Sequence, residues 1–123
     1  MTAGRSHRVT LIPGDGVGPE VIAAAIRIVE ASGVVVQWDR QLAGQAAVEE
    51  YGLPISDQLM KSIRRNRVAL KGPLATQVGT GFRSVNVALR KAFDLYANLR
   101  PVKNVPGIDS PFSGVDLVVV REN

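Results

Sequence analysis

Residues 71–100 read KGPLATQVGTGFRSVNVALRKAFDLYANLR, and this stretch decides the fold and the binding chemistry of the chain. A glycine-bearing loop comes first, and glycine lets a backbone approach a ligand without an intervening side chain. A helix begins near Ser84, where free N–H groups and the helix dipole concentrate positive charge. Asn86 and Arg90 are four residues apart and therefore share one helix face. The pattern predicts a site for a small anion that carries several carboxylates or a phosphate.

Towards the amino terminus, residues 8–40 predict a strand, a helix and a second strand. The runs 8–12 (RVTLI) and 34–40 (VVVQWDR) are rich in β-branched residues, which favour strands. Gly33 is the expected end of the helix between them. That helix has one apolar stripe, formed by Val21, Ile22, Ala25, Ile26 and Val29. The order predicts a βαβ unit with parallel strands and a right-handed crossover.

The rest of the chain continues the alternation of helices and strands. Gly52 is expected to end a short helix, and Ser56 is a good N-cap for a helix to about residue 65. The further expected elements are a strand over 67–70, a helix over 84–93 with Val85, Leu89 and Ala92 inward, an extended segment over 95–102 and a strand over 115–120. The last strand, VDLVVV, does not alternate, which indicates burial on both faces. The fold class is therefore α/β, with a largely parallel sheet and helices on both faces.

Gly14, Gly16 and Gly18 follow the first strand in a pattern close to a dinucleotide fingerprint. That fingerprint is G-x-G-x-x-G with an acidic residue at the end of the second strand. Here the glycines are spaced two and two, although Asp39 lies at about the right distance for the acidic residue. The spacing favours a tight turn from strand into helix.

Composition narrows the classes of function. The chain has 123 residues, of which 46% are hydrophobic and 21% charged, as in one globular domain at most. It has no cysteine and one histidine, His7, so we expect no disulfide, no thiol catalysis and no Ser-His-Asp triad. The net charge is +4, but no aromatic-rich basic motif for base stacking and no membrane-spanning run occurs. We therefore expect neither nucleic acid nor membrane as a partner, and a cytoplasmic location.

Four motifs together resemble the β-decarboxylating dehydrogenases, the family of the isocitrate and isopropylmalate dehydrogenases. They are TLIPGDGVGPEV at 10–21, ALKGPL at 69–74, FRSVNVALRKAFDLYANLRP at 82–101 and LVVVREN at 117–123. The resemblance covers nearly the whole chain but only the first third or so of a family member. It implies that residues 1–98 begin the large cofactor-side domain and that residues 99–123 form the crossover and the first strand of the small domain.

The resemblance also implies roles for individual residues. Isocitrate enzymes look like S-x-N-x-x-x-R at the start of the central helix, whereas isopropylmalate enzymes replace the polar pair there. The implied substrate-binding residues are Ser84, Asn86, Arg90, Arg100 and Arg121, and the implied cofactor-binding residues are Lys71, Thr76 and Val17. Isocitrate carries about three negative charges, which three guanidinium groups can pair bidentately.

By resemblance, the complete enzyme oxidises isocitrate and decarboxylates it to 2-oxoglutarate with NAD or NADP. The sequence DLYANLRPVKN resembles the NAD-dependent members and favours NAD. Mg²⁺ or Mn²⁺ is expected, because the family's metal ligands are carboxylates. Those ligands and the family's proton-transfer residues lie downstream of the matching motifs. We therefore expect no catalytic residue and no metal ligand in this chain, and no activity from the 123 residues alone.

A second class of function stays open at this point. The chain is alternatively a non-catalytic fragment or a regulatory-subunit-like protein that binds a ligand. Homoisocitrate or 3-isopropylmalate is an alternative substrate within the family. Sites of the family combine residues of two subunits, so the resemblance implies a homo- or hetero-oligomer, in the cytoplasm or, in a eukaryote, in the mitochondrial matrix.

Overall fold

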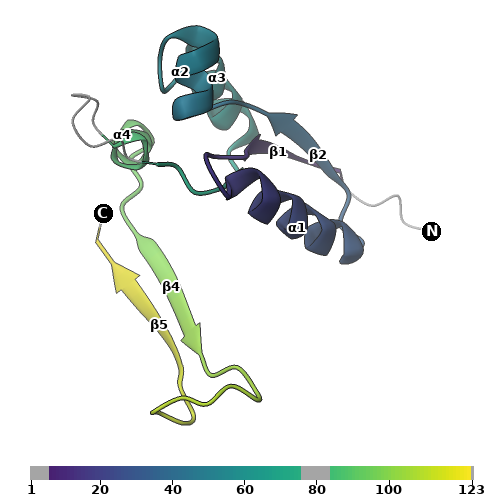
Figure 1. Cartoon of the computed structure of the whole chain (residues 1–123), viewed down its shortest axis with the longest axis vertical. Helices are drawn as coiled ribbons and strands as arrows, with labels where there is room; N and C mark the ends of the chain where they lie inside the picture. Colours follow the sequence, from purple (N-terminus) through teal and green to yellow (C-terminus); the bar gives the residue numbers. More distant parts are fainter. Residues whose placement is uncertain (1–5, 76–83, 123) are drawn as a thin grey trace. The chain divides into compact units, whose positions relative to one another are not determined.

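The computed structural model of the chain describes residues 6–75 and 84–122 (Figure 1). The chain divides into two units, Met1–Asn86 and Val87–Asn123. Among the described residues, the first unit contains a three-stranded sheet and the second a two-stranded ladder. Each unit thus has its own hydrogen-bonded strands.

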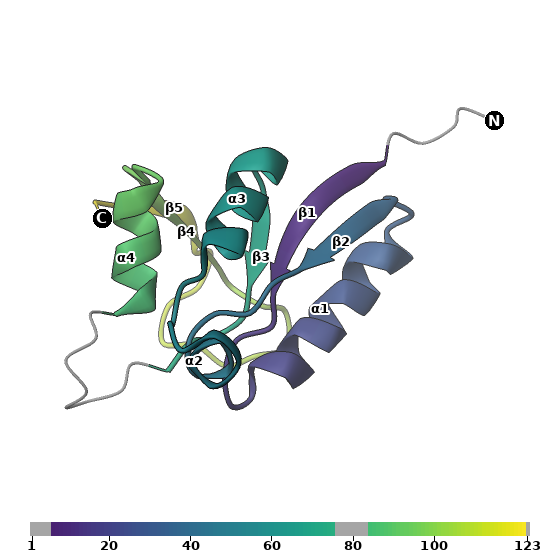
Figure 2. The same ribbon diagram turned by 90° about the horizontal axis from the view of Figure 1, so that it is seen from above.

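The strand β1 (His7–Ile12) is the middle strand of the first unit. It pairs in parallel with β2 (Val36–Arg40) on one side and with β3 (Ala69–Lys71) on the other, in the order β2-β1-β3 (Figure 2). The helix α1 (Gly18–Ala31) connects β1 to β2. The predicted βαβ unit is therefore confirmed, and it follows from the apolar periodicity of these segments.

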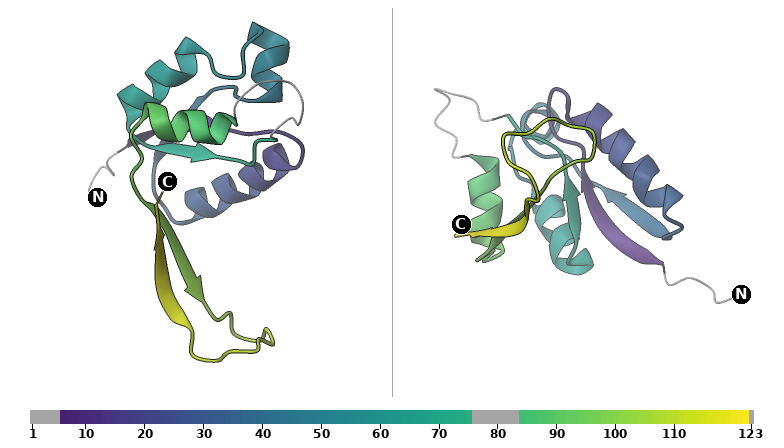
Figure 3. Two further views of the ribbon diagram at one scale, coloured as in Figure 1. Left: turned by 90° about the vertical axis from the view of Figure 1, so that its left-hand side faces the viewer. Right: turned by 90° about the horizontal axis from the view of Figure 1, so that it is seen from below.

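Helices cover both faces of this sheet. The helix α1 lies on one face, whereas α2 (Gln45–Tyr51) and α3 (Asp57–Asn66) lie on the other (Figures 1 and 3). The buried apolar side chains of the sheet and these layers include Leu11, Ile12, Ile22, Ala47 and Leu59. The expected α/β class, with a parallel sheet and helices on both faces, is confirmed for this unit.

Helix ends fall where the sequence places caps. The Oγ atom of Ser56 accepts a hydrogen bond from the backbone N–H of Leu59 (3.2 Å) at the start of α3. Gly52 ends α2 in the left-handed conformation, with φ of 74°. Within residues 6–75 and 84–122, the structure has no helix both long and apolar enough to cross a bilayer.

Two side chains predicted to face inward are exposed instead. In α1, Ile22 is buried, but Val21 is 49% exposed, because it lies about 100° around the helix from Ile22, at the margin of the apolar stripe. In α4 (Val85–Ala92), Val85 and Leu89 are buried as predicted. Ala92 is exposed, because it is the last residue of the helix. Apolar periodicity therefore identifies the inner face of a helix better than its margins and ends.

The second unit contains β4 (Asn98–Lys103) and β5 (Asp116–Arg121), which form an antiparallel ladder. The prediction that residues 115–120 are buried on both faces is wrong for this structure. All six residues of β5 are exposed, and in the described part of the chain β5 pairs with β4 alone. An apolar run becomes buried only when a second layer covers it, and a two-stranded ladder does not provide that layer by itself.

Candidate functional site

Two loops meet at the carboxyl end of the parallel sheet: the turn between β1 and α1, and the segment that follows β3. Gly14 has a φ of 85°, and a Cβ atom there would collide with the carbonyl oxygen of Pro73. A Cβ atom on Gly72 would likewise collide with the carbonyl oxygen of Pro13. These glycines therefore allow two backbones to pack closely, which supports the interpretation of the glycine pattern as a structural turn.

Asp15 ties the two loops together, although no sequence pattern singled it out. Its backbone N–H donates to the carbonyl oxygen of Pro73 (2.8 Å), and its Oδ2 accepts from the backbone N–H of Ala75 (3.1 Å). Its Oδ1 accepts from the backbone N–H of Gln45 at the start of α2 (3.1 Å). An acidic residue between two turn glycines is the only signal in the sequence, and it does not identify partners 30 and 60 residues away.

The predicted cofactor-binding residues belong to these loops where the structure describes them. Val17 directly precedes α1 and is 59% exposed. Lys71 ends β3, and its Nζ atom donates to the carbonyl oxygen of Gly72 (2.7 Å). Thr76 lies outside the described residues. The structure thus places Val17 at the end of one loop and Lys71 directly before the other, and the two loops are hydrogen-bonded to each other.

Ser84 and Asn86 stand at the start of α4 and Arg90 stands in its last turn, in the expected order along the chain. Ser84 is half-buried and directly precedes the helix. The Oδ1 atom of Asn86 is buried and has no hydrogen-bond partner among the described residues. A buried acceptor without a partner is costly, so a ligand group that donates a hydrogen bond to Oδ1 would be favoured here, whereas a carboxylate would have to accept from the Nδ2 group. Arg90 follows one turn later, and in the second unit it lines a cavity of about 330 Å³ together with Lys91, Tyr96 and Glu122.

Arg100 and Arg121 lie on the same face of the β4–β5 ladder. Arg121 stands opposite Asn98 and Arg100 stands opposite Val119, so the two arginines are diagonal neighbours. Diagonal neighbours in a ladder are about 7–8 Å apart, within reach of one small polyanion. Among the residues that the structure describes, no ion pair or hydrogen bond engages the guanidinium groups of Arg90, Arg100 or Arg121.

Asp39, at the end of β2, belongs to a polar network with α3. Its Oδ2 accepts from the Oγ of Ser62 (2.7 Å) and the Nδ2 of Asn66 (3.0 Å) and pairs with Arg65 (2.5 Å), while its Oδ1 accepts from Gln41 (2.8 Å). These donors, Ser62 foremost and Gln41 next, hold the pKa of the Asp39 carboxyl far below its ordinary value of 3.8. The carboxylate is occupied by the protein, so it is not available to hold a ribose.

Replacing Asp39 with asparagine is expected to lower the free energy of unfolding at pH 7 by roughly 1–3 kcal/mol, because charged hydrogen bonds are lost. The pKa of Asp39 is lowered in the folded state, so its stabilising effect is complete above about pH 5 and is lost progressively as the pH falls. Urea unfolding at pH 7 and pH 3 should therefore show the gap between the two proteins closing at the lower pH. A gap of equal size at both pH values would contradict this account.

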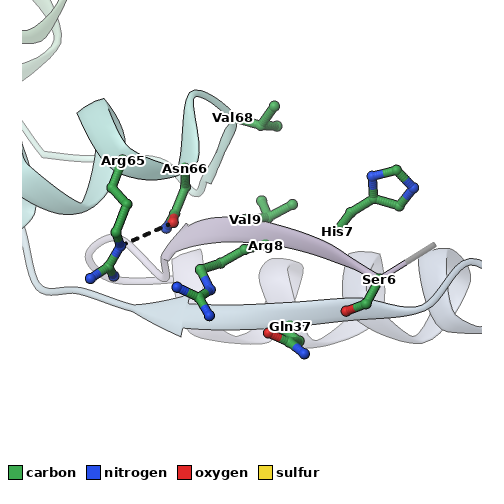
Figure 4. Close-up of a pocket in the computed structure, with 8 residues that line it drawn as sticks. All are labelled: Ser6, His7, Arg8, Val9, Gln37, Arg65, Asn66 and Val68. Atoms are coloured by element: carbon green, nitrogen blue, oxygen red, sulfur yellow. Dashed lines mark hydrogen bonds between the residues drawn. The ribbon is translucent and has the colours of Figure 1, made fainter.

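A second cavity, of about 480 Å³, lies at the amino end of β1 (Figure 4). Arg8, Arg65 and Asn66 are among the residues that line it, and Figure 4 shows the guanidinium group of Arg65 hydrogen-bonded to Asn66. Asp39 neutralises that same guanidinium group. Arg8 and Arg65 therefore do not form a pair of uncompensated cations that could bind an anion in this cavity. No predicted site residue lines it.

The family resemblance implies a metal ion and a nicotinamide nucleotide, and the described residues suit the two unequally. No three acidic, histidine or cysteine side chains lie close enough together to hold a metal ion anywhere in the described part of the chain, so no step is assigned to a metal. A nicotinamide nucleotide would find open space at the turn after β1, which lies at the carboxyl end of a parallel strand, where ligands of α/β folds commonly bind. In that turn a Cβ atom on Gly16 would meet only open space, and the neighbouring Val17 is exposed.

Comparison with known proteins gives consistent matches. A family model described as isocitrate/isopropylmalate dehydrogenase matches residues 8–123. The chain is 46% identical to the NADP isocitrate dehydrogenase of Thermus thermophilus, covering 94% of this chain and 24% of that protein. It is 42% identical to a mitochondrial regulatory subunit of the NAD isocitrate dehydrogenase of Dictyostelium discoideum, covering 95% and 31%. The crystal structure of isocitrate dehydrogenase from Methylococcus capsulatus matches with a TM-score of 0.91 and 58% identity, over 95% of this chain and 34% of that one. The chain thus spans about a third or less of the length of these relatives.

Proposed function

Because the chain belongs to the isocitrate/isopropylmalate dehydrogenase family, we propose that it forms the amino-terminal part of an enzyme that oxidises and decarboxylates isocitrate to 2-oxoglutarate. The observation that carries this proposal is a set of arginines without acidic partners among the described residues: Arg90, Arg100 and Arg121. Carboxylates of a bound substrate would supply the countercharge. Ser84 and Asn86 would add neutral donors at the start of the helix that carries Arg90.

In this proposal, the residues of the chain bind and orient the substrate. Arg100 and Arg121 share one face of a ladder, so their guanidinium groups can hold neighbouring carboxylates, while Arg90 holds a third. Fixing the carboxylates fixes the hydroxyl-bearing carbon, and such positioning accounts for a large part of the rate enhancement of many enzymes. A bound nicotinamide nucleotide would supply the hydride acceptor.

The cofactor side of the site is proposed to include Val17, Lys71 and Thr76. The nucleotide is NAD or NADP, because relatives with both names match the chain. Mg²⁺ or Mn²⁺ is proposed as the metal, with carboxylate ligands outside this chain. We further propose that residues 1–98 belong to the cofactor-side domain and that residues 99–123 begin the small domain.

A second candidate function is that of a non-catalytic regulatory chain, and the Dictyostelium relative favours it. Either function is proposed to operate in an oligomer, because the name of that relative describes one of several subunits. The location would be the cytoplasm or the mitochondrial matrix. Because the family description also names isopropylmalate, 3-isopropylmalate is an alternative substrate. Homoisocitrate is a further alternative by resemblance.

A hybrid enzyme tests the proposal: this chain replaces the matching amino-terminal part of the Methylococcus capsulatus isocitrate dehydrogenase. We expect the hybrid to reduce NAD or NADP with isocitrate, with kcat/KM at least about a hundredfold above that for 3-isopropylmalate or homoisocitrate, because only isocitrate satisfies all the donors. Preference for another of these acids would change the proposed substrate. A folded hybrid without turnover that still binds isocitrate would favour the regulatory function.

A further inference from the structure

The backbone after β3 is held by the end of β1 and by the turn that follows it, through three hydrogen bonds. The N–H of Gly72 donates to the carbonyl oxygen of Ile12 (2.8 Å), and the N–H of Asp15 donates to the carbonyl oxygen of Pro73 (2.8 Å). The N–H of Ala75 donates to the Oδ2 of Asp15 (3.1 Å). Only the last of these bonds depends on a side chain, so one substitution can remove it without altering the backbone pairing.

The other carboxylate oxygen of Asp15 is used as well. Its Oδ1 accepts from the N–H of Gln45, the first residue of α2. Gly44, which precedes α2, gives the carboxylate room, because a Cβ atom there would collide with Oδ2 of Asp15. Both oxygens of Asp15 therefore accept from backbone groups, and one carboxylate connects three segments that lie 30 and 60 residues apart in the sequence.

This connection reaches Lys71. The Nζ atom of Lys71 donates to the carbonyl oxygen of Gly72, so the position of the ammonium group depends on the backbone that the turn holds in place. The same turn carries Val17, which is 59% exposed. Asp15 thus connects the two loops that carry the described residues of the proposed nucleotide side, and it does so through hydrogen bonds to backbone groups.

We infer that Asp15 is a positioning residue for nucleotide binding: its carboxylate locks the turn that carries Val17 to the loop that carries Lys71. This inference rests on the proposed function, since it assigns a role to Asp15 in the same site. A carboxylate suits the task because it offers only acceptors, whereas an asparagine amide would turn an N–H₂ group towards one of the two backbone donors. Loss of the lock should therefore weaken nucleotide binding more than substrate binding.

The first test measures amide hydrogen exchange in the 123-residue protein and its Asp15→Asn variant. We expect exchange at Gln45 or Ala75 to become about tenfold faster or more, because one of these N–H groups loses its acceptor. The matched control is Asp39→Asn, which removes a carboxylate from the same unit without touching these loops. Because Asp39→Asn destabilises the whole unit, each rate is compared with that of the Thr10 amide, which donates to the carbonyl oxygen of Val68. Unchanged exchange at both amides in Asp15→Asn, or a rise at both no larger than the rise at Thr10, would overturn the inference.

The second test measures kinetics and nucleotide binding in the hybrid enzyme with the same two substitutions. We expect Asp15→Asn to raise KM and Kd for NAD or NADP by about tenfold, with KM for isocitrate changed by less than about threefold. Asp39→Asn should leave this ratio unchanged. Equal rises in both KM values would overturn the inference. If the hybrid turns over no isocitrate at all, the proposed function fails, while calorimetric titration of the nucleotide still decides the role of Asp15.

Discussion

The Ser84→Asp substitution in the hybrid enzyme is expected to weaken isocitrate binding by at least about a hundredfold, while the melting temperature stays level or rises. Ser84 directly precedes α4, where an added anion is favourable by about 0.3–1 kcal/mol, so the fold should accept the charge. The substrate should not accept it. Two unit charges about 4 Å apart near a protein surface repel by roughly 4 kcal/mol, and the new carboxylate would also compete for Arg90.

Ser84→Ala is the matched control for this prediction. It removes one neutral hydrogen bond, which is worth about 0.5–1.5 kcal/mol, so the affinity for isocitrate should fall by no more than about tenfold. Calorimetric titration of isocitrate and thermal unfolding of the two variants give the comparison. If the Asp and Ala variants lose the same affinity, the charge argument is wrong and Ser84 does not meet a substrate carboxylate.

The Gly14→Ala substitution is expected to destabilise the first unit strongly, by about 3 kcal/mol or more. Gly14 has a φ of 85°, a conformation that costs an L-residue about 1–2 kcal/mol. In addition, the new Cβ would collide with the carbonyl oxygen of Pro73, which is backbone and cannot rotate away. The two loops would have to separate, and the hydrogen bond from Asp15 to Pro73 would be lost with them.

Gly16→Ala separates the two causes of that loss. Gly16 also has a positive φ, of 56°, but a Cβ there would meet nothing within 4 Å. Its substitution should cost only the backbone term, about 1–2 kcal/mol. Urea unfolding of both variants measures the difference. Equal losses would show that the backbone conformation, and not the contact between the loops, makes glycine necessary at Gly14.

Local patterns were enough to predict the elements of the first unit. The βαβ order followed from apolar periodicity, and the end of α2 at Gly52 and the start of α3 at Ser56 followed from residues whose effect is confined to one turn. The exposure of β5 could not be predicted, because a strand's burial depends on the layers that cover it and not on its own composition.

The candidate site was predictable in its residue types and only partly in its geometry. The spacing of Asn86 and Arg90 defines a common helix face, which any helix produces. The common face of Arg100 and Arg121 depends on the register of β4 with β5, which the sequence does not reveal. The networks of Asp15 and Asp39 were missed for the same reason. Most of their partners lie 23 to 60 residues away in the sequence. The residues around a polar side chain in a turn or strand do not indicate which distant residue it will bond.

The central place of β1 in its sheet has a consequence for how the unit assembles. Its first partner, β2, follows within the next thirty-odd residues, but its second, β3, ends only at Lys71, and the bonds from Thr10 to Ser62 and Asn66 join residues 52 and 56 apart. Such contacts form only after a long loop has closed. The chain therefore loses conformational entropy before the contacts stabilise it, and the sheet should form slowly. On a growing chain, β1 emerges first and keeps one edge unpaired until β3 has been synthesised. During that interval this edge of β1 is open to pairing with another polypeptide.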